Sequence, residues 1–105
     1  MTPPRGLYFE DYDDSLDIIS AGRTVTETDI VQFCQISGDW NQLHCDVEFA
    51  KTTPFGQRIA HGLLGLSIGT GLGGSMGFID GTAIAFLGLS WKFVKPILIG
   101  DTIRL

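Results

Sequence analysis

The sequence predicts an α+β fold, because helical segments in its first two-thirds are followed by an alternating strand pattern. Residues 27–36 combine a helix start with apolar side chains at helical spacing. Residues 61–76 form an apolar, glycine-rich run, and residues 82–94 alternate large apolar side chains with smaller or polar ones. A chain of 105 residues has room for one core, so we expect a single domain over residues 1–105.

The composition is that of a folded protein and argues against two classes of partner. Apolar residues make up 44% of the chain, the formal net charge is −5, and only seven residues are Lys or Arg. So few cations on an acidic chain disfavour binding to nucleic acid or to a membrane. Cys34 and Cys45 have no C-x-x-C spacing, and the N-terminus has no apolar signal segment. We therefore expect a cytoplasmic protein with reduced thiols that pack as buried filler.

The first helix has both a start and a stop signal. Thr26 can cap it, and Asp29 stands at the third helical position, where it completes a capping box. Val25 and Ile30 flank the start and can form a hydrophobic staple. Gly38 follows the last helical position and predicts the end of the helix.

The segments on either side of this helix are less regular. Residues 1–15 predict an irregular lead-in, whose acidic residues lack the glycine and the distal glutamate of a calcium-binding loop. We interpret them as a solvated turn. Further along, Asp46 can cap a short helix from Val47 to about Thr52, which Pro54 ends.

The last third of the sequence predicts strands. Asp80-Gly81 is typical of a turn, and the strand predicted over 82–94 places one set of side chains on one face: Leu87, Leu89, Trp91 and Phe93. Residues 102–105 predict a last short strand that has no following partner. The chain therefore resembles the first two-thirds of a domain, and we expect its C-terminal strands to be missing.

The stretch HGLLGLSIGTGLGGSMG, residues 61–77, matches three motifs that we do not interpret as functional. A G-x-S-x-G nucleophile needs a later histidine, but His44 and His61 both precede Ser67. The G-x-G-x-x-G over 69–74 leaves too few residues for the helix that a dinucleotide fold requires. Glycines four residues apart suit a membrane-helix dimer, but a buried helix packed closely against a sheet explains the same residues.

Three polar residues that can support acid–base chemistry follow the first helix, and they are Asp39, Asn41 and His44. A carboxylate and a neutral imidazole that share a water form an acid–base pair near neutral pH. Loops rich in Asp and Asn are also commonly turns and caps, so spacing alone leaves both interpretations open. The backbone N–H groups of His61 and Gly62, at the start of the glycine-rich helix, could stabilise an enolate on a thioester carbonyl. We expect the His61 side chain to bond to backbone rather than to take part in catalysis.

A metal site is the alternative interpretation of the same histidines. His44, Cys45, Asp46 and His61 resemble a two-histidine, one-carboxylate iron set. The separation is short for that use, and a helix cap explains Asp46 better. We therefore expect no metal.

The run FCQISGDWNQLH, from Phe33 to His44, resembles the hydratase-2 motif of the MaoC-like dehydratase family, which contains (R)-specific enoyl-CoA hydratases. The resemblance extends from Leu7 to Leu105 and includes later positions: Asp46, Ala50, Thr53, Phe55, His61-Gly62, Phe93, Pro96 and Gly100-Asp101-Thr102. It implies the hot-dog fold, in which a curved antiparallel sheet wraps around a central helix. The glycine-rich segment would be that helix.

The resemblance also implies a function. Members of this family are hydro-lyases of fatty acid metabolism that convert trans-2-enoyl-CoA to (R)-3-hydroxyacyl-CoA. Asp39 and His44 match the catalytic pair that holds the water, Asn41 matches the supporting asparagine, and Gly62 matches the oxyanion N–H donor. Thr70 falls where relatives have a pocket-lining serine. The substrate is a CoA or acyl-carrier thioester, no cofactor is required, and the expected assembly is a homodimer or a larger homo-oligomer.

The sequence departs from the family pattern in two places. Gln42 stands where the family has proline, which leaves the loop less restricted in φ and adds an N–H. The chain ends at Leu105, which would expose a sheet edge. Two alternatives to the hydratase stay open: a non-catalytic hot-dog subunit that binds acyl groups or dimerises, and a thioesterase. The thioesterase needs a water aimed at the carbonyl carbon, and the motif favours the hydratase.

Overall fold

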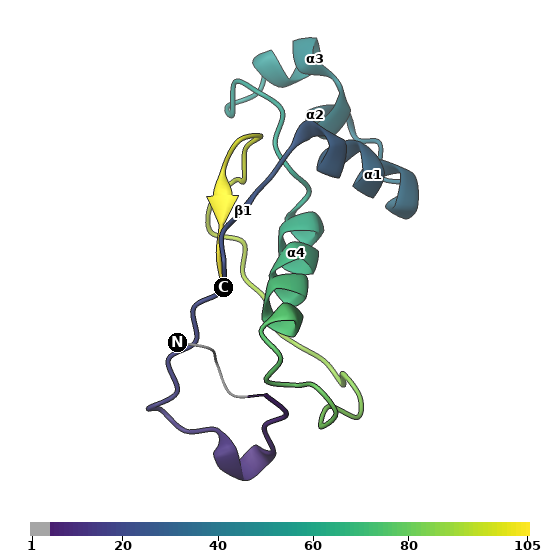
Figure 1. Cartoon of the computed structure of the whole chain (residues 1–105). Helices are drawn as coiled ribbons and strands as arrows, with labels where there is room; N and C mark the ends of the chain where they lie inside the picture. Colours follow the sequence, from purple (N-terminus) through teal and green to yellow (C-terminus); the bar gives the residue numbers. More distant parts are fainter. Residues whose placement is uncertain (1–4) are drawn as a thin grey trace.

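Helix α4, Gly62–Ser75, runs through the middle of the molecule in the computed structural model, which describes residues 5–105 (Figure 1). Three helices gather at one end, and a small sheet lies beside α4. These remaining elements are η1 Phe9–Asp11, β1 Arg23–Thr24, α1 Glu27–Ser37, α2 Gln42–Cys45, α3 Val47–Lys51 and β2 Thr102–Ile103. The radius of gyration is 16.4 Å. A compact domain of this length has about 13 Å, so the molecule is elongated.

Helix α1 begins and ends where the sequence predicts. The Thr26 hydroxyl accepts the Asp29 N–H at 3.2 Å, and the Asp29 carboxylate accepts the Thr26 N–H at 2.8 Å, which completes the capping box. Gly38 ends the helix with a φ of +77°, a conformation that favours glycine. Arg23 donates two hydrogen bonds to the Asp29 carboxylate, at 2.8 and 3.0 Å. The Arg23 guanidinium therefore holds the pKa of Asp29 well below its usual range.

Two short helices follow, and the sequence predicts only the second of them. Asn41 caps α2, because its side-chain oxygen accepts the Leu43 N–H at 2.9 Å. Asp46 caps α3 in the predicted way by accepting the Phe49 N–H at 2.9 Å. Helix α2 has only four residues and therefore carries no apolar periodicity that a sequence pattern could show.

The glycine-rich stretch is a helix, as predicted. Because Gly62 to Ser75 is helical throughout, neither glycine motif forms the strand-to-helix turn that its function requires. The Ser67 hydroxyl donates to the Leu63 carbonyl at 2.7 Å, within the helix. Among residues 5–105, no helix has the length and apolar character needed to cross a membrane.

The predicted strand over 82–94 was wrong. Residues 83–94 pair with no other strand in the described part of the chain. The alternating pattern shows which side chains can share a face, but a strand also needs a hydrogen-bonded neighbour. The last run, which has no following strand to pair with, pairs instead with an earlier one: β2 lies antiparallel to β1, with Arg23 opposite Ile103 and Thr24 opposite Thr102. A two-residue strand such as β1 is too short to show a period of two.

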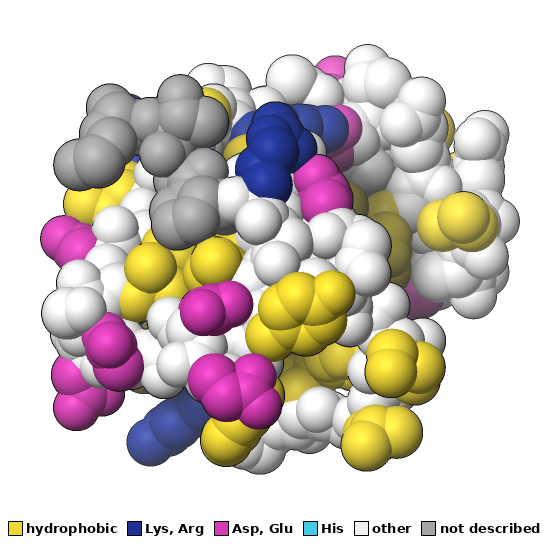
Figure 2. All heavy atoms as spheres, turned by 60° about the horizontal axis from the view of Figure 1, so that its bottom comes forward, with side chains coloured by type: hydrophobic (Ala, Val, Ile, Leu, Met, Phe, Trp, Pro, Cys, Tyr) yellow, Lys and Arg dark blue, Asp and Glu magenta, His cyan; other side chains and the backbone are white. Residues whose placement is uncertain are grey.

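The core lies where α1, the start of α4 and the C-terminal segment meet. Its buried members are Val25, Ile30, Cys34, Ala60 and Leu64. Partly buried side chains pack against them, namely Phe33, Ile68, Ile97 and Ile103. Many other apolar side chains are exposed, and Figure 2 shows several of them on one face among scattered acidic groups. The core is therefore small and lies at the end of the molecule where α1 packs.

The two cysteines differ. Cys34 is a buried member of the core, as expected, and burial raises the pKa of its thiol. Cys45 was expected to be buried and is exposed instead, because it ends the short helix α2 away from the core. Its Sγ lies 3.3 Å from the Trp40 carbonyl oxygen. Both thiols are free.

The lead-in is largely irregular, as predicted, apart from η1; its residues 1–4 lie outside the described part of the chain. Two of its acids are engaged in local hydrogen bonds. Asp11 accepts the Tyr8 N–H at 2.9 Å, and Asp13 accepts the Ser15 N–H at 2.8 Å. These local bonds agree with the solvated turn that the sequence predicts.

Candidate active site

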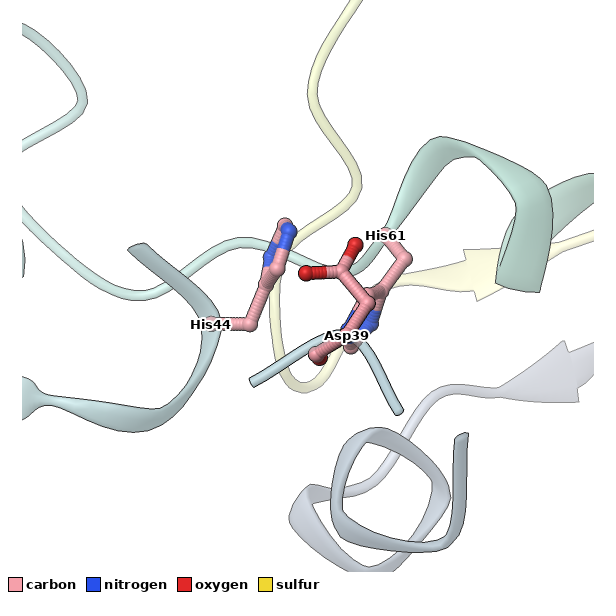
Figure 3. A group of neighbouring side chains, drawn as sticks. All are labelled: Asp39, His44 and His61. Carbon is pink, nitrogen blue, oxygen red and sulfur yellow. The ribbon is translucent and has the colours of Figure 1, made fainter. Parts of the chain in front are cut away.

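Asp39 and His44 come together because α1 ends and α2 begins within a few residues. The Asp39 N–H donates to the Ser37 hydroxyl at 3.1 Å, and the Asp39 carboxylate accepts the Asn41 N–H at 3.2 Å. Asn41 then caps α2, which carries His44. A carboxylate oxygen of Asp39 and one ring nitrogen each from His44 and His61 lie within 4.8 Å of one another. Figure 3 shows the Asp39 carboxylate beside the His44 ring, with His61 next to both.

The hydrogen bonding of His44 determines which of its nitrogens is available. Nδ1 lies 2.8 Å from the Ile59 carbonyl oxygen, and His44 is half-buried. A carbonyl oxygen only accepts hydrogen bonds, so Nδ1 carries the hydrogen and Nε2 is the basic nitrogen. Asp39 is exposed, which leaves its carboxylate open to solvent. The site thus presents two acceptors, a carboxylate and an imidazole nitrogen.

His61 is the third residue of this cluster, and it was not among the site residues that the sequence predicts. It is 4% exposed and precedes α4 at the N-cap position, and its Nε2 lies 2.9 Å from the Asp39 carbonyl oxygen. This bond to backbone confirms the expectation for its side chain. Its ring also stacks on the His44 ring, with centroids 3.8 Å apart and planes inclined by 27°. No sequence pattern indicates the stacking, because the two histidines lie on different elements that only the fold brings together.

Gly62 lies at the edge of the same cluster. As the first residue of α4, it has a backbone N–H without an acceptor inside the helix, at the positive end of the helix dipole. A Cβ at this position would lie 2.6 Å from the Phe93 ring, so only glycine fits without displacing Phe93. This placement suits the expected oxyanion donor.

Thr70 lies away from this cluster. Its side chain is exposed, its hydroxyl donates to the Ser67 carbonyl at 2.7 Å, and it is absent from the residues that line the main cavity. Thr70 is therefore placed apart from the other expected site residues, and its pocket-lining role stays a prediction. The physical reason is its position on α4, where it faces solvent rather than the C-terminal segment.

The main cavity has a volume of about 1000 Å³ and runs along α4. Most of its walls are apolar, and they include Leu63, Leu66, Leu72, Trp91, Phe93 and Ile97. Asp39, His44 and His61 do not line it. The cavity meets the cluster at Gly62 and at Ile59, whose carbonyl binds His44. An apolar molecule in the cavity could therefore place one end beside the polar cluster.

The iron set considered from the sequence does not assemble. Asp46 caps α3, and the Cys45 thiol lies against the Trp40 carbonyl. Asp39 joins the two histidines instead, within 4.8 Å. Lone pairs of imidazole nitrogens lie in the ring plane, so stacked rings direct them side by side rather than at one point. An ion held by both rings at about 2.0–2.1 Å would require one ring to rotate.

Comparisons with known proteins identify the family. A family model described as "MaoC like domain" matches residues 17–105. The chain is 35% identical over 100 residues to a 3-hydroxybutyryl-CoA dehydratase of Methylorubrum extorquens, covering 95% of this chain and 62% of the relative. It is 35% identical over 96 residues to an (R)-specific enoyl-CoA hydratase of Rhodospirillum rubrum, covering 91% and 65% of the two chains. The chain thus spans less than two-thirds of the length of these curated relatives.

Solved structures agree with this result. A monoamine oxidase regulatory protein from Archaeoglobus superposes with a TM-score of 0.86 and 42% identity, covering 99% of this chain and 71% of that one. The (R)-hydratase from Aeromonas caviae superposes with a TM-score of 0.71 and 32% identity, covering 88% and 70%. These likenesses confirm the α+β hot-dog fold, in which α4 is the central helix. The chain belongs to the MaoC-like dehydratase family.

Proposed function

We propose that this protein is a hydro-lyase that reversibly adds water to trans-2-enoyl-CoA, or to a related acyl thioester, to give the (R)-3-hydroxyacyl thioester. The observation that carries the proposal is the placement of the Asp39 carboxylate and a His44 ring nitrogen within 4.8 Å of each other. A carboxylate and an imidazole at that separation can both bind one water at ordinary hydrogen-bond lengths. The names of the dehydratase and hydratase relatives support the same reaction.

The arrangement supplies the proton transfers that hydration requires. The water donates one hydrogen bond to Asp39 and the other to Nε2 of His44, whose Nδ1–H is held by the Ile59 carbonyl. One proton passes to the pair as the hydroxyl adds to the β-carbon, and a proton from the pair then reaches the α-carbon. In the proposal, Asp39 is the base toward the water, and His44 holds the water and supplies or relays the second proton. Because the two groups act as a coupled pair, an observed apparent pKa of the reaction belongs to the pair rather than to either residue.

Gly62 and the apolar cavity supply the remaining parts of the proposal. As the hydroxyl adds, the electrons of the double bond move toward the thioester carbonyl and form an enolate. The Gly62 N–H at the start of α4 stabilises that negative charge. The apolar cavity that reaches Gly62 accommodates the acyl chain.

The remaining expectations belong to the same proposal. The reaction uses no cofactor beyond the CoA or acyl-carrier thioester that is its substrate. Residues 1–105 belong to one MaoC-like domain, which assembles as a homodimer or a larger homo-oligomer. It works in the cytoplasm, and the two free cysteines support a reducing compartment.

The test is hydration of crotonyl-CoA, followed by the loss of enoyl-thioester absorbance, in the parent protein and in Asp39→Asn and His44→Gln. Each substitution removes one member of the pair and should lower kcat by about 100-fold to 10,000-fold. Asp14→Asn is the matched control, because Asp14 is exposed and lies in the lead-in, away from the cluster. Its rate should equal that of the parent.

Other outcomes decide between the alternatives. A folded parent that releases free CoA without hydrating the double bond would be a thioesterase. A folded parent that binds enoyl thioesters of several lengths but converts none would be a non-catalytic acyl-binding subunit. Either result would contradict the hydratase proposal.

A further inference from the structure

One buried side chain contacts both members of the proposed catalytic pair. Nε2 of His61 lies 2.9 Å from the Asp39 carbonyl oxygen, and the His61 ring stacks on the His44 ring with centroids 3.8 Å apart. His61 itself is held by burial and by the Phe33 ring, whose centroid lies 4.8 Å away. Asp39 is exposed and His44 half-buried, so the most constrained member of the cluster is His61.

The contact with Asp39 acts on the main chain rather than on the carboxylate. Since a carbonyl oxygen accepts, Nε2 of His61 carries the hydrogen and donates it. The Asp39 N–H donates to the Ser37 hydroxyl, so the backbone of Asp39 is anchored on both of its polar groups. An anchored backbone limits how far the exposed Asp39 side chain can move relative to His44.

The contact with His44 acts on the ring. The Nδ1–H of His44 donates to the Ile59 carbonyl. This single hydrogen bond does not prevent the ring from rotating about the N–H···O axis. The stacked face of His61 restricts this rotation and holds the His44 ring beside the Asp39 carboxylate. The hydrogen bond fixes the His44 ring within its own plane, and the stacking limits its movement out of that plane.

The two ring nitrogens of His61 indicate that this position needs a hydrogen-bond donor and not only a ring. Nδ1 is buried and has no hydrogen-bond partner within the described part of the chain. A buried polar atom without a partner is unfavourable, and a phenyl ring in the same place would avoid it. The hydrogen bond from Nε2 to Asp39 is the compensation that a phenyl ring could not provide.

We propose that His61 is a positioning residue, which holds the Asp39 main chain through Nε2–H and the His44 ring through stacking, so that both face one water. The proposal rests on the proposed hydratase function and deepens it. His61 takes no proton from substrate or water in this scheme. Its effect is on how often the pair is in the productive geometry, which affects kcat rather than substrate binding.

Three substitutions separate the two contacts. His61→Gln keeps a side-chain N–H donor for the Asp39 carbonyl and removes the ring. His61→Phe keeps a ring against His44 and removes the donor. His61→Ala removes both. We expect kcat for crotonyl-CoA to fall about 10-fold in the first two and about 100-fold in His61→Ala, with KM within about twofold of the parent.

A control distinguishes positioning from loss of stability. Val25→Ala opens a cavity in the same core, and Val25 contacts neither member of the pair through any hydrogen bond or ring contact. This variant should melt at a lower temperature and, measured well below its melting point, keep the kcat of the parent. The proposal is overturned if Val25→Ala loses as much kcat as the His61 variants, or if folded His61→Ala keeps the parent kcat. If His61→Ala does not fold, the test uses His61→Gln and His61→Phe instead. The proposal is then overturned if both folded variants keep the parent kcat.

A second readout does not depend on turnover. In NMR spectra, ring stacking shifts the His44 ring protons, and the hydrogen bond to the Asp39 carbonyl affects the amide signal of Trp40, which shares a peptide group with that carbonyl. We expect His61→Gln to move the His44 ring signals, and His61→Phe to move the Trp40 amide signal. A parent without hydratase activity but with these shifts would sink the proposed function and keep the positioning role. Unchanged signals in both variants would overturn the positioning role, whatever the activity.

Discussion

Residues 26–61 and residues 83–94 are both rich in apolar side chains, but the two regions differ in how far these side chains are buried. In the first region Ile30 is 1% exposed and Cys34 is fully buried, whereas in the second Ile84 is 99% and Leu87 97% exposed. The first region consists of short helices, each closed by a cap within a few residues of chain. The second is an extended segment that pairs with no strand in the described part of the chain. Helices complete their hydrogen bonds locally, and strands do not.

The same difference determines where the candidate site lies. Asp39, His44 and His61 all belong to the capped region. The extended segment approaches them through Phe93, which packs against Gly62. The residues proposed to move protons therefore depend mainly on local structure. The pocket for the acyl chain depends on the extended segment as well.

The largest expected difference in stability tests this contrast directly. Ile30→Ala removes a fully buried side chain from the core and should lower the free energy of unfolding by about 2–5 kcal/mol. Leu87→Ala removes a side chain of the same size from an exposed position and should change it by less than about 0.5 kcal/mol. Urea titrations of both variants measure the two values. A large loss in Leu87→Ala would mean that the extended segment is covered in solution.

A second prediction concerns the cap that begins α1. Thr26→Ala removes the hydroxyl that accepts the Asp29 N–H and should cost about 1 kcal/mol. Thr28→Ala is the matched control, because Thr28 is exposed in the first turn of the same helix and is not the cap. It should leave the stability within about 0.5 kcal/mol of the parent. Equal losses in the two variants would show that the cap does not stabilise this region.

The pH dependence of stability sharpens the role of the Arg23–Asp29 pair. Because Arg23 lowers the pKa of folded Asp29, the pair's contribution is fully present above the unfolded-state pKa of about 3.9. It is lost as the pH falls through the lower pKa of the folded state. Asp29→Asn should therefore be less stable than the parent by up to about 1 kcal/mol at pH 7, and the gap should close toward pH 2. Thermal melts across that range measure the gap, and a constant gap would contradict the ion pair as its source.

The smallest expected effect compares two faces of α4. A Cβ at Gly71 would meet no atom within 4 Å, so Gly71→Ala should raise helix stability by about 0.5–1 kcal/mol. A Cβ at Gly65 would lie 2.5 Å from Cδ1 of Ile97, so Ile97 must move. Gly65→Ala should therefore stabilise the protein less than Gly71→Ala does, or destabilise it. Differential scanning calorimetry of the two variants gives the sign of each change. A gain from Gly65→Ala equal to that from Gly71→Ala would show that Ile97 moves without cost.

Much of the helical region could be predicted because its signals are local. Thr26 and Asp29, Gly38, and Asp46 each affect residues no more than four positions away, and each helix boundary follows from them. The pair Asp39 and His44 could be named from a family motif. The short helix α2 was missed, since four residues carry no period, although its cap Asn41 was among the expected site residues.

The strands and the third member of the cluster could not be predicted in the same way. The sheet joins Thr24 to Thr102, and alternation within either segment does not identify the other. Thr70 was expected in the pocket by analogy of position, and the orientation of α4 leaves it in solvent. Both outcomes depend on how distant segments pack.

The sequence by itself determined the capped helices, the glycine-rich helix, the family and the proposed catalytic pair, because these depend on neighbouring residues or on a contiguous motif. The tertiary structure decided that residues 83–94 form no strand, that β1 pairs with β2, and that His61 stacks on His44 while it holds the Asp39 carbonyl. The physical reason is range: a cap or a helical hydrogen bond joins residues within one turn, whereas strand pairing and ring stacking join residues that only folding brings into contact.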